Sequence, residues 1–362
     1  MKSVSLFSGI NGLSVGTPIL YCDVNKHAVE VLEARMRDGS IPTAPIYSDV
    51  CLLEKLPTEV EIITAGFPCT DISSAGLKAG LTGERSGLFF HVVRLAQISK
   101  TPFVFLENVN NFRMLPDVWK TVLLAMHSIG YDSHWITTTS EQVGAPHLRR
   151  RWFCLCTFVG DRCPAHNHEE LTRAGRKMYP CGTFVDGKYC KSHPVVAGEK
   201  SSINLLLTPL LGKRKCQSTD MVTRPLKRSR FPTPRANGGS FCANGLTHRC
   251  SYDLATVLRF EKATKEDERW VRHGRPSPAF VEWMMGFPDG WTNPDISLTG
   301  QTHNNWTREP MGIPRLAISN IPSSHRLFLL GNACVPAQGR FAWKELYRRV
   351  TGPKNQLLGD QS

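Results

Sequence analysis

The first 158 residues alternate short runs of β-branched, aliphatic or aromatic residues with longer stretches of mixed polarity. Short apolar runs are typical of buried strands, and the stretches between them are long enough for crossover helices. This rhythm restricts the fold most, because strands that alternate with helices pair in parallel into an α/β sheet. The expected strands are Val4–Phe7, Ile19–Asp23, Glu61–Ala65, Pro102–Leu106 and Trp152–Phe158. The expected helices are Lys26–Arg37, Ser86–Ile98 and Val118–Ile129.

The rhythm ends near Phe158. The residues that follow are rich in Pro, Gly, Cys, His and basic side chains, and clean periodicity returns only at Phe280–Met285 and Arg340–Val350. We therefore predict an α/β domain built from residues 1–158 and 325–350, with a smaller, irregular domain inserted over residues 159–324. Residues 351–362 are expected to form a flexible tail.

The expected insert carries concentrated positive charge. The whole chain has 44 Lys and Arg residues against 31 Asp and Glu, a formal net charge of +13, which favours a polyanionic partner. Between residues 212 and 235 eight basic residues are opposed by a single acid, Asp220. They are Lys213, Arg214, Lys215, Arg224, Lys227, Arg228, Arg230 and Arg235. This basic run either contacts phosphates or forms a solvated loop.

Other classes of protein are disfavoured. No run approaches the ~20 apolar residues that span a bilayer, and the first ten residues lack the features of a signal peptide. We expect a soluble, unsecreted protein in which most of the 12 cysteines are reduced. Six cysteines and histidines with metal-like spacing form either a structural zinc site or free thiols and surface imidazoles. They are Cys163, His166, His168, Cys181, Cys190 and His193.

A glycine-containing turn follows the first expected strand. Its sequence, Phe7-Ser8-Gly9-Ile10-Asn11-Gly12, departs from G-x-G-x-x-G because Asn11 occupies the place of the second glycine. A dinucleotide phosphate cradle is therefore not expected. A cofactor can still approach the backbone of such a turn, and Asp23 at the end of the next strand is placed to bind a ribose diol. The alternative is a glycine turn without a ligand.

Three further segments place reactive side chains beside expected strands. Cys69 follows the strand Glu61–Ala65, at the carboxyl edge where α/β sheets form their sites. It is a nucleophile if loop amides stabilise its thiolate, and otherwise a small buried thiol. Glu107 ends an apolar run, and an apolar site can keep such a carboxyl group protonated. Arg149 and Arg151 alternate at the start of a strand and are expected to share one face.

In this order, the motifs resemble the DNA (cytosine-5)-methyltransferase family of phages, bacteria and large viruses. The resemblance covers most of residues 1–158 and 325–350. Its motifs are Phe7–Gly12, Asp23, Ser48-Asp49-Val50, Pro68-Cys69, Arg85–Leu95, Glu107-Asn108-Val109, Pro146–Arg151, Trp283–Pro288 and Gly331–Pro336. Three positions depart from the common pattern: Asn11 replaces Gly, Thr70 replaces Gln and His147 replaces Gln. None of these changes removes a catalytic group.

The resemblance implies a Rossmann-like, S-adenosylmethionine-dependent fold with an inserted target-recognition domain, and methyl transfer to C5 of cytosine. It implies that Cys69 adds to C6 of a flipped base, that Glu107 holds the N3 edge, and that Arg149, assisted by Arg151, holds the nucleotide. The residues implied to bind S-adenosylmethionine are Phe7, Gly9, Ile10, Asn11, Gly12, Asp23, Val24, Asp49, Val50, Pro68, Leu88 and Asn332.

The implied partner is double-stranded DNA, with the basic run on phosphates and unidentified side chains on base edges. We expect a monomer without a membrane partner, and a restriction endonuclease is a conceivable second partner. The expected location is the cytoplasm in a prokaryote or phage host, and the cytoplasm or nucleus in the host of a virus.

Two alternatives from other classes remain. A transfer-RNA cytosine-5 methyltransferase shares the catalytic motifs, although the long basic insert favours duplex DNA. A non-catalytic DNA-binding relative is disfavoured because Cys69, Glu107 and Arg149 are all present. A Rossmann dehydrogenase is excluded by Asn11 and by the lack of a residue set that could handle a hydride.

Overall fold

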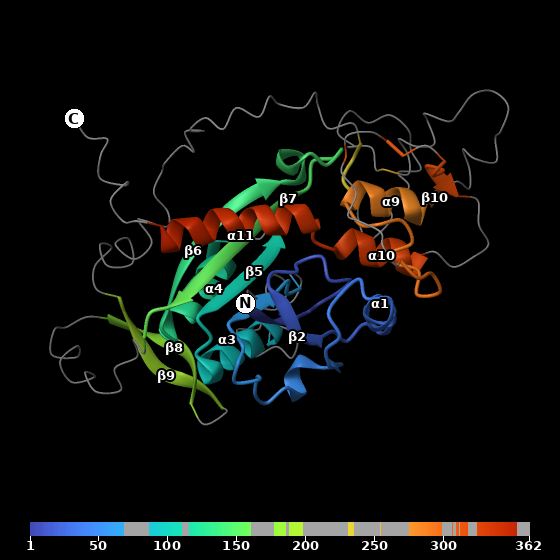
Figure 1. The fold of residues 1–362 in the computed structure, drawn as a ribbon. Helices are drawn as coiled ribbons and strands as arrows, with labels where there is room; N and C mark the ends of the chain where they lie inside the picture. Colours follow the sequence, from blue (N-terminus) through green and yellow to red (C-terminus); the bar gives the residue numbers. More distant parts are fainter. Residues whose placement is uncertain are drawn as a thin grey trace, which may run out of the picture.

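A seven-stranded sheet forms the centre of the protein in the computed structural model (Figure 1). The structure describes residues 1–68, 87–110, 116–160, 177–185, 188–197, 231–234, 254, 275–298, 306, 309–310, 312–317 and 324–352. The strand order is β3-β2-β1-β4-β5-β7-β6. The strands are β1 (Lys2–Leu6), β2 (Thr17–Cys22), β3 (Ile46–Tyr47), β4 (Ile62–Ala65), β5 (Phe103–Val109), β6 (Tyr131–Thr139) and β7 (Arg150–Phe158).

The strands from β3 to β5 pair in parallel, and β7 runs antiparallel to both of its neighbours, β5 and β6. The predicted α/β class with a mostly parallel sheet is therefore confirmed. The sequence missed β6, because its residues are mixed in polarity and several are only half-buried. It also ended β5 too early: the strand continues through Glu107 to Val109.

Helices cover both faces of the sheet. On one face α3 (Leu88–Ser99) and α4 (Pro116–Ser128) bury Val93 and Met126 in the same cluster as Val4 and Ile63 of the strands. On the other, α11 (Pro336–Thr351) lies across the sheet, with Leu346 in a cluster with strand residues (Figure 1). These apolar layers explain the burial of the parallel strands on both faces.

A third apolar cluster joins segments that are far apart in the sequence. Helix α1 (Lys26–Arg37) begins where the Asn25 side chain accepts hydrogen bonds from the amides of His27 and Ala28. It packs in one cluster with α9 (Pro278–Met285) and α10 (Ser324–Asn332). Helices α9 and α10, which come late in the sequence, thereby pack against a helix from the first half of the chain.

The crossover from β1 to β2, residues 7–16, contains no helix. Parallel strands are usually joined through a helix, and crossover helices were expected throughout this sheet. Here the chain turns through left-handed conformations at Phe7, Gly9 and Asn11, with φ of 54°, 52° and 63°. The Ile10 carbonyl accepts a 3.0 Å hydrogen bond from the Trp291 indole, which ties the crossover to the residues after α9.

Two small antiparallel pairs lie outside the large sheet. They are β8 (Lys177–Val185) with β9 (Lys188–Ala197), and β10 (Arg275–Pro276) with β11 (Leu316–Ala317). The first hairpin falls in the region for which the sequence predicted an irregular domain, and its proline-containing strands gave no clean alternation. The division into a catalytic domain, an inserted domain and a tail stays a prediction.

The predicted zinc ligands fall partly outside the described residues, which exclude Cys163, His166 and His168. In the β8–β9 hairpin the backbone register places Cys181 opposite His193. Among the residues that the structure describes, no three Cys, His, Asp or Glu side chains are grouped to hold a metal ion. The zinc site stays a prediction. Within the same ranges no helix is long and apolar enough to cross a bilayer.

Candidate active site

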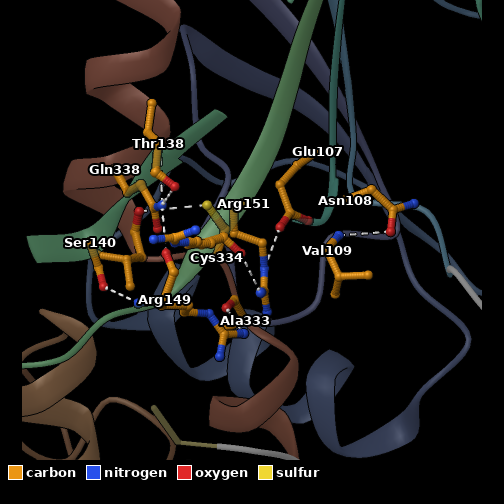
Figure 2. Close-up of polar contacts among 12 residues, drawn as sticks. Glu107, Asn108, Val109, Thr138, Ser140, Arg149, Arg151, Ala333, Cys334 and Gln338 are labelled. Carbon is orange, nitrogen blue, oxygen red and sulfur yellow. Dashed lines mark hydrogen bonds and ion pairs between the residues drawn. The ribbon is translucent and has the colours of Figure 1, made fainter. Parts of the chain in front are cut away.

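Glu107 lies on β5 and forms the centre of the candidate site. Its carboxylate Oε1 is 2.8 Å from Nε of Arg151, which extends from the neighbouring strand β7 (Figure 2). Only 8% of Glu107 is exposed. Burial raises the pKa of this carboxyl group, and the nearby guanidinium groups of Arg151 and Arg149 oppose that rise. The result is a buried acid beside a paired cation at the carboxyl end of a parallel strand.

The segment that leads to Cys69 lies directly against Glu107. The Asn108 side chain donates a 3.2 Å hydrogen bond to the Phe67 carbonyl. A Cβ atom added at Gly66 would lie 3.3 Å from Oε2 of Glu107. The ends of β4 and β5 therefore meet as predicted, up to Pro68. Cys69 lies outside the described residues, and its position beside Glu107 stays a prediction.

We predict that Gly66→Ala lowers kcat by about three- to tenfold, because a shift of a few tenths of an ångström in the Glu107 carboxylate misplaces it. The measurement is steady-state methyl transfer at saturating DNA and cofactor. Gly339→Ala in α11 is the matched control, since its Cβ would meet its nearest neighbour, Leu13, at an ordinary 3.4 Å. Equal kcat values for the two variants would contradict the close approach of Gly66 to Glu107.

Arg149 is almost completely buried, with 2% of its surface exposed. Its guanidinium donates hydrogen bonds to the carbonyls of Pro234 (2.9 Å), Gly331 (2.7 Å) and Ala333 (2.8 Å). Burial, with Arg151 nearby, lowers the pKa of Arg149 to about 9, so it stays charged at neutral pH. Arg149 therefore clamps the residues on either side of Asn332 to the start of β7. Its predicted contact with a nucleotide stays a prediction.

The alternation expected of the arginines is confirmed. Arg149 and Arg151 both contact groups inside the protein (Figure 2), whereas Arg150 between them is exposed. The structure also shows that the two arginines have different partners, which their spacing alone did not predict. Arg151 pairs with the carboxylate, and Arg149 binds backbone carbonyls.

Sequence reasoning missed two residues of this site, Gln338 and Cys334. Gln338 of α11 donates hydrogen bonds to the carbonyls of Thr138 (3.1 Å) and Arg149 (2.9 Å), which fixes the β6–β7 hairpin to the helix (Figure 2). Cys334 is buried, and desolvation together with the Glu107 charge raises the pKa of its thiol. A glutamine on a helix is ordinarily exposed, so the burial of Gln338 could not be predicted from residue type.

The candidate cofactor region surrounds the turn after β1. Asp23 accepts hydrogen bonds from the backbone amides of Gly9 (2.7 Å) and Asn25 (2.9 Å). Burial raises the pKa of Asp23, and these two bonds oppose the rise. Asp49 accepts from the Cys51 amide at 2.8 Å, which lowers the pKa of Asp49. Space is open where Gly9 would carry a Cβ atom.

Three other residues of the predicted cofactor set are apolar and at least partly exposed. Val24 is 83% exposed and Pro68 is exposed, while Leu88 is half-buried. An open glycine, two carboxylates that can accept hydrogen bonds and an uncovered apolar surface fit a ligand with hydroxyl groups, an amine and a flat ring. These hydrogen-bond acceptors and apolar side chains therefore suit S-adenosylmethionine.

Four other predicted cofactor residues, Ile10, Asn11, Gly12 and Val50, make protein contacts. Ile10 and Val50 are buried in apolar clusters. Gly12 packs so closely that an added Cβ would lie 2.3 Å from the Cys334 carbonyl oxygen. Asn11 lines a cavity of about 400 Å³ whose other lining residues do not belong to the predicted set. Phe7 is half-buried, and Asn332 is exposed. Cofactor contacts by all six stay predictions.

Comparison with known families identifies the chain. The C-5 cytosine-specific DNA methylase family matches residues 1–203, more than half of the sequence. The chain belongs to this family. The predicted resemblance is thereby confirmed, and the family region contains Glu107, Arg149 and Arg151.

Named relatives of the chain support the same family. The type II methyltransferase M.CviJI of Paramecium bursaria Chlorella virus IL3A is 37% identical over 163 residues, 42% of each chain. M.HhaI of Haemophilus parahaemolyticus is 30% identical over 164 residues, which cover 43% of this chain and 49% of the relative. The chain thus spans less than half the length of these relatives.

Solved structures similar to this chain include a DNMT2 mutant from Spodoptera frugiperda and Dnmt2 from S. pombe. Each is 14% identical with a TM-score of 0.48, and the alignments cover 96% and 95% of this chain and 99% of each neighbour. At this TM-score the likeness adds nothing to the strand order described above.

Proposed function

We propose that this protein is a DNA methyltransferase that transfers a methyl group from S-adenosylmethionine to C5 of cytosine. The observation that carries the proposal is the buried Glu107–Arg151 pair, held beside the segment that leads to Cys69 in a chain of this family. We infer further that residues 159–324 recognise the DNA sequence, and that the protein acts as a monomer.

Cytosine C5 is a weak nucleophile, so the base has to be activated. The Cys69 thiolate forms a bond to C6, and Glu107 supplies the proton or hydrogen bond at N3 that favours this addition. The added electron density makes C5 nucleophilic. After C5 is methylated, loss of its proton restores the ring double bond and expels Cys69. Because the reacting atoms lie inside the duplex, the cytosine has to leave the base stack.

The remaining residues position these groups. Arg151 neutralises and orients Glu107, and Arg149 holds the residues around Asn332 against β7. Asp23 and Asp49 would hold the hydroxyl and amino groups of the cofactor, with Val24, Pro68 and Leu88 against its ring. S-Adenosylmethionine, when bound, supplies an electrophilic methyl group.

Bisulfite sequencing of DNA from cells that express this protein tests the function directly. We expect protected cytosines in one recurring sequence context, which would also give the recognition site. Cells that express Cys69→Ser provide the background. A wild-type sample with no protected cytosines above that background would contradict the proposed function.

The basic run leads to a separate prediction about DNA binding. Neutralising Lys227, Arg228 and Arg230, which lie outside the described residues, should weaken binding to all sequences alike. Each lost phosphate contact should flatten the dependence of log K on log salt by about one unit, because fewer counterions are released. The measurement is affinity over a salt series, with methylated sites mapped in parallel. An unchanged slope would show that the run is a solvated loop.

A further inference from the structure

His147 is a fully buried imidazole just before β7, and both of its ring nitrogens have partners. Nε2 lies 3.1 Å from the carbonyl oxygen of Met284, and Nδ1 lies 3.1 Å from the hydroxyl oxygen of Ser140. A carbonyl only accepts hydrogen bonds, so Nε2 carries the proton and donates. The Ser140 hydroxyl has a single hydrogen, which it donates to the His147 backbone carbonyl at 2.7 Å and shares with Nδ1 in a three-centre bond.

The imidazole is held in its uncharged form. Burial and the positive charge of Arg149, with a smaller effect of Arg151, lower the pKa of His147 to about 3. Over the pH range in which proteins work, the ring therefore presents one donor and one acceptor. A carboxamide side chain offers the same pair of groups.

The bridge joins three segments that are distant in the sequence. Met284 belongs to α9, and Ser140 begins the turn after β6. His147 also pairs in parallel with Phe231, whose amide donates a 3.0 Å hydrogen bond to the Pro146 carbonyl. The backbone on which Arg149 and Arg151 stand is thus anchored just before both arginines.

A second contact shows how closely this anchor is connected to Arg149. The Ser140 hydroxyl oxygen that contacts His147 also accepts a 2.9 Å hydrogen bond from the Arg149 amide. Only Leu148 separates His147 from Arg149 in the sequence, and the same serine contacts both residues. A shift of His147 would therefore be transmitted to the start of β7.

We propose that His147 is a positioning residue, whose donor–acceptor bridge between Met284 and Ser140 sets the start of β7 and with it Arg149 and Arg151. This inference rests on the proposed function, because the positioned groups serve methyl transfer. Within the described residues, the ring nitrogens of His147 contact Met284 and Ser140 and not Glu107. Its replacement should therefore change the rate of a folded enzyme rather than remove a chemical step.

Two substitutions distinguish the hydrogen-bonding role of the His147 side chain from its role in filling space. His147→Gln retains one donor and one acceptor, whereas His147→Leu fills the space, leaves the Met284 carbonyl without this donor, and leaves the Ser140 hydroxyl bonded only to the backbone carbonyl of residue 147. Active enzyme is counted by covalent trapping on DNA that contains 5-fluorocytosine, and kcat is expressed per trapped molecule. We expect His147→Gln to keep kcat within about threefold of wild type, and His147→Leu to lower it about tenfold or more.

A histidine outside this network provides the matched control. His134 is exposed on β6, and His134→Leu should leave kcat per trapped molecule unchanged. The pH profile between 5 and 8 should have the same shape for wild type and His147→Gln. An inflection present only in wild type would mean that His147 transfers a proton, which would overturn the positioning role.

The outcomes distinguish this inference from the function on which it rests. An active wild type for which His147→Leu and His147→Gln have equal kcat per trapped molecule would overturn the positioning role alone. A wild type that methylates no DNA would overturn the proposed function, and the positioning role would fall with it.

Discussion

Replacing Cys69 with serine is expected to abolish methyl transfer while DNA binding persists. A serine hydroxyl is almost fully protonated at neutral pH and is a far weaker nucleophile than a thiolate, so kcat should fall by about 10⁴-fold or more. The same change should abolish covalent trapping on DNA that carries 5-fluorocytosine in the target site, since fluorine at C5 cannot leave as a proton. The measurements are methyl incorporation and gel separation of the trapped complex.

Cys51→Ser is the matched control for the nucleophile. Cys51 is an exposed free cysteine in the described part of the chain, and a serine there can still form a hydrogen bond with Asp49. This variant should be trapped like the wild type. Trapped complex formed by Cys69→Ser would refute the assignment of Cys69, even if the variant had lost turnover for another reason.

Glu107→Gln is expected to lower kcat by about 10²- to 10⁴-fold, the usual range for loss of a general acid or base. The amide keeps the shape of the carboxyl group and can hydrogen-bond Arg151, but it cannot supply a proton. Because burial raises the pKa of Glu107, the protonated form persists to higher pH than for an exposed glutamate. Wild-type kcat should therefore fall as pH rises through that raised pKa, and the residual rate of Glu107→Gln should lack this decline.

Glu59→Gln, at an exposed position, should leave both kcat and its pH dependence unchanged. Affinity for S-adenosylmethionine should be the same in wild type and Glu107→Gln, since the carboxyl group is assigned to the base. Full activity of Glu107→Gln would show that Glu107 is only a structural partner of Arg151.

Much of the fold follows from local pattern. The apolar runs that become β1, β2 and β4 are buried on both faces, so composition alone identifies them within a few residues. β6 could not be found in this way, because its residues are mixed in polarity. Which of them are buried is decided only by the packing of β7 and α11 against the strand. The helix-free crossover between β1 and β2 was also missed, since a glycine-containing turn is equally compatible with a following helix.

In the candidate site, too, some residues were predictable from the sequence and their partners were not. Glu107, Arg149 and Arg151 were predicted from residue type at strand ends, and the antiparallel pairing of β7 with β5 brings Arg151 beside Glu107. The separate partners of the two arginines were not predictable, because Gly331, Ala333 and Pro234 approach Arg149 only through the tertiary fold. His147 looked like a simple departure from a family pattern until its two ring contacts were visible.

The position of α11 has a consequence for biosynthesis. This helix supplies Ala342 and Leu346 to the cluster that contains Phe105 and Phe153 of the central strands. A ribosome makes all seven strands of the sheet before it reaches residue 336, so α11 is missing from this sheet face while the intervening residues are made. We therefore expect nascent chains to expose apolar strand residues that α11 later covers, which favours aggregation. Final assembly of the catalytic groups thus has to follow synthesis of the helix that carries Gln338.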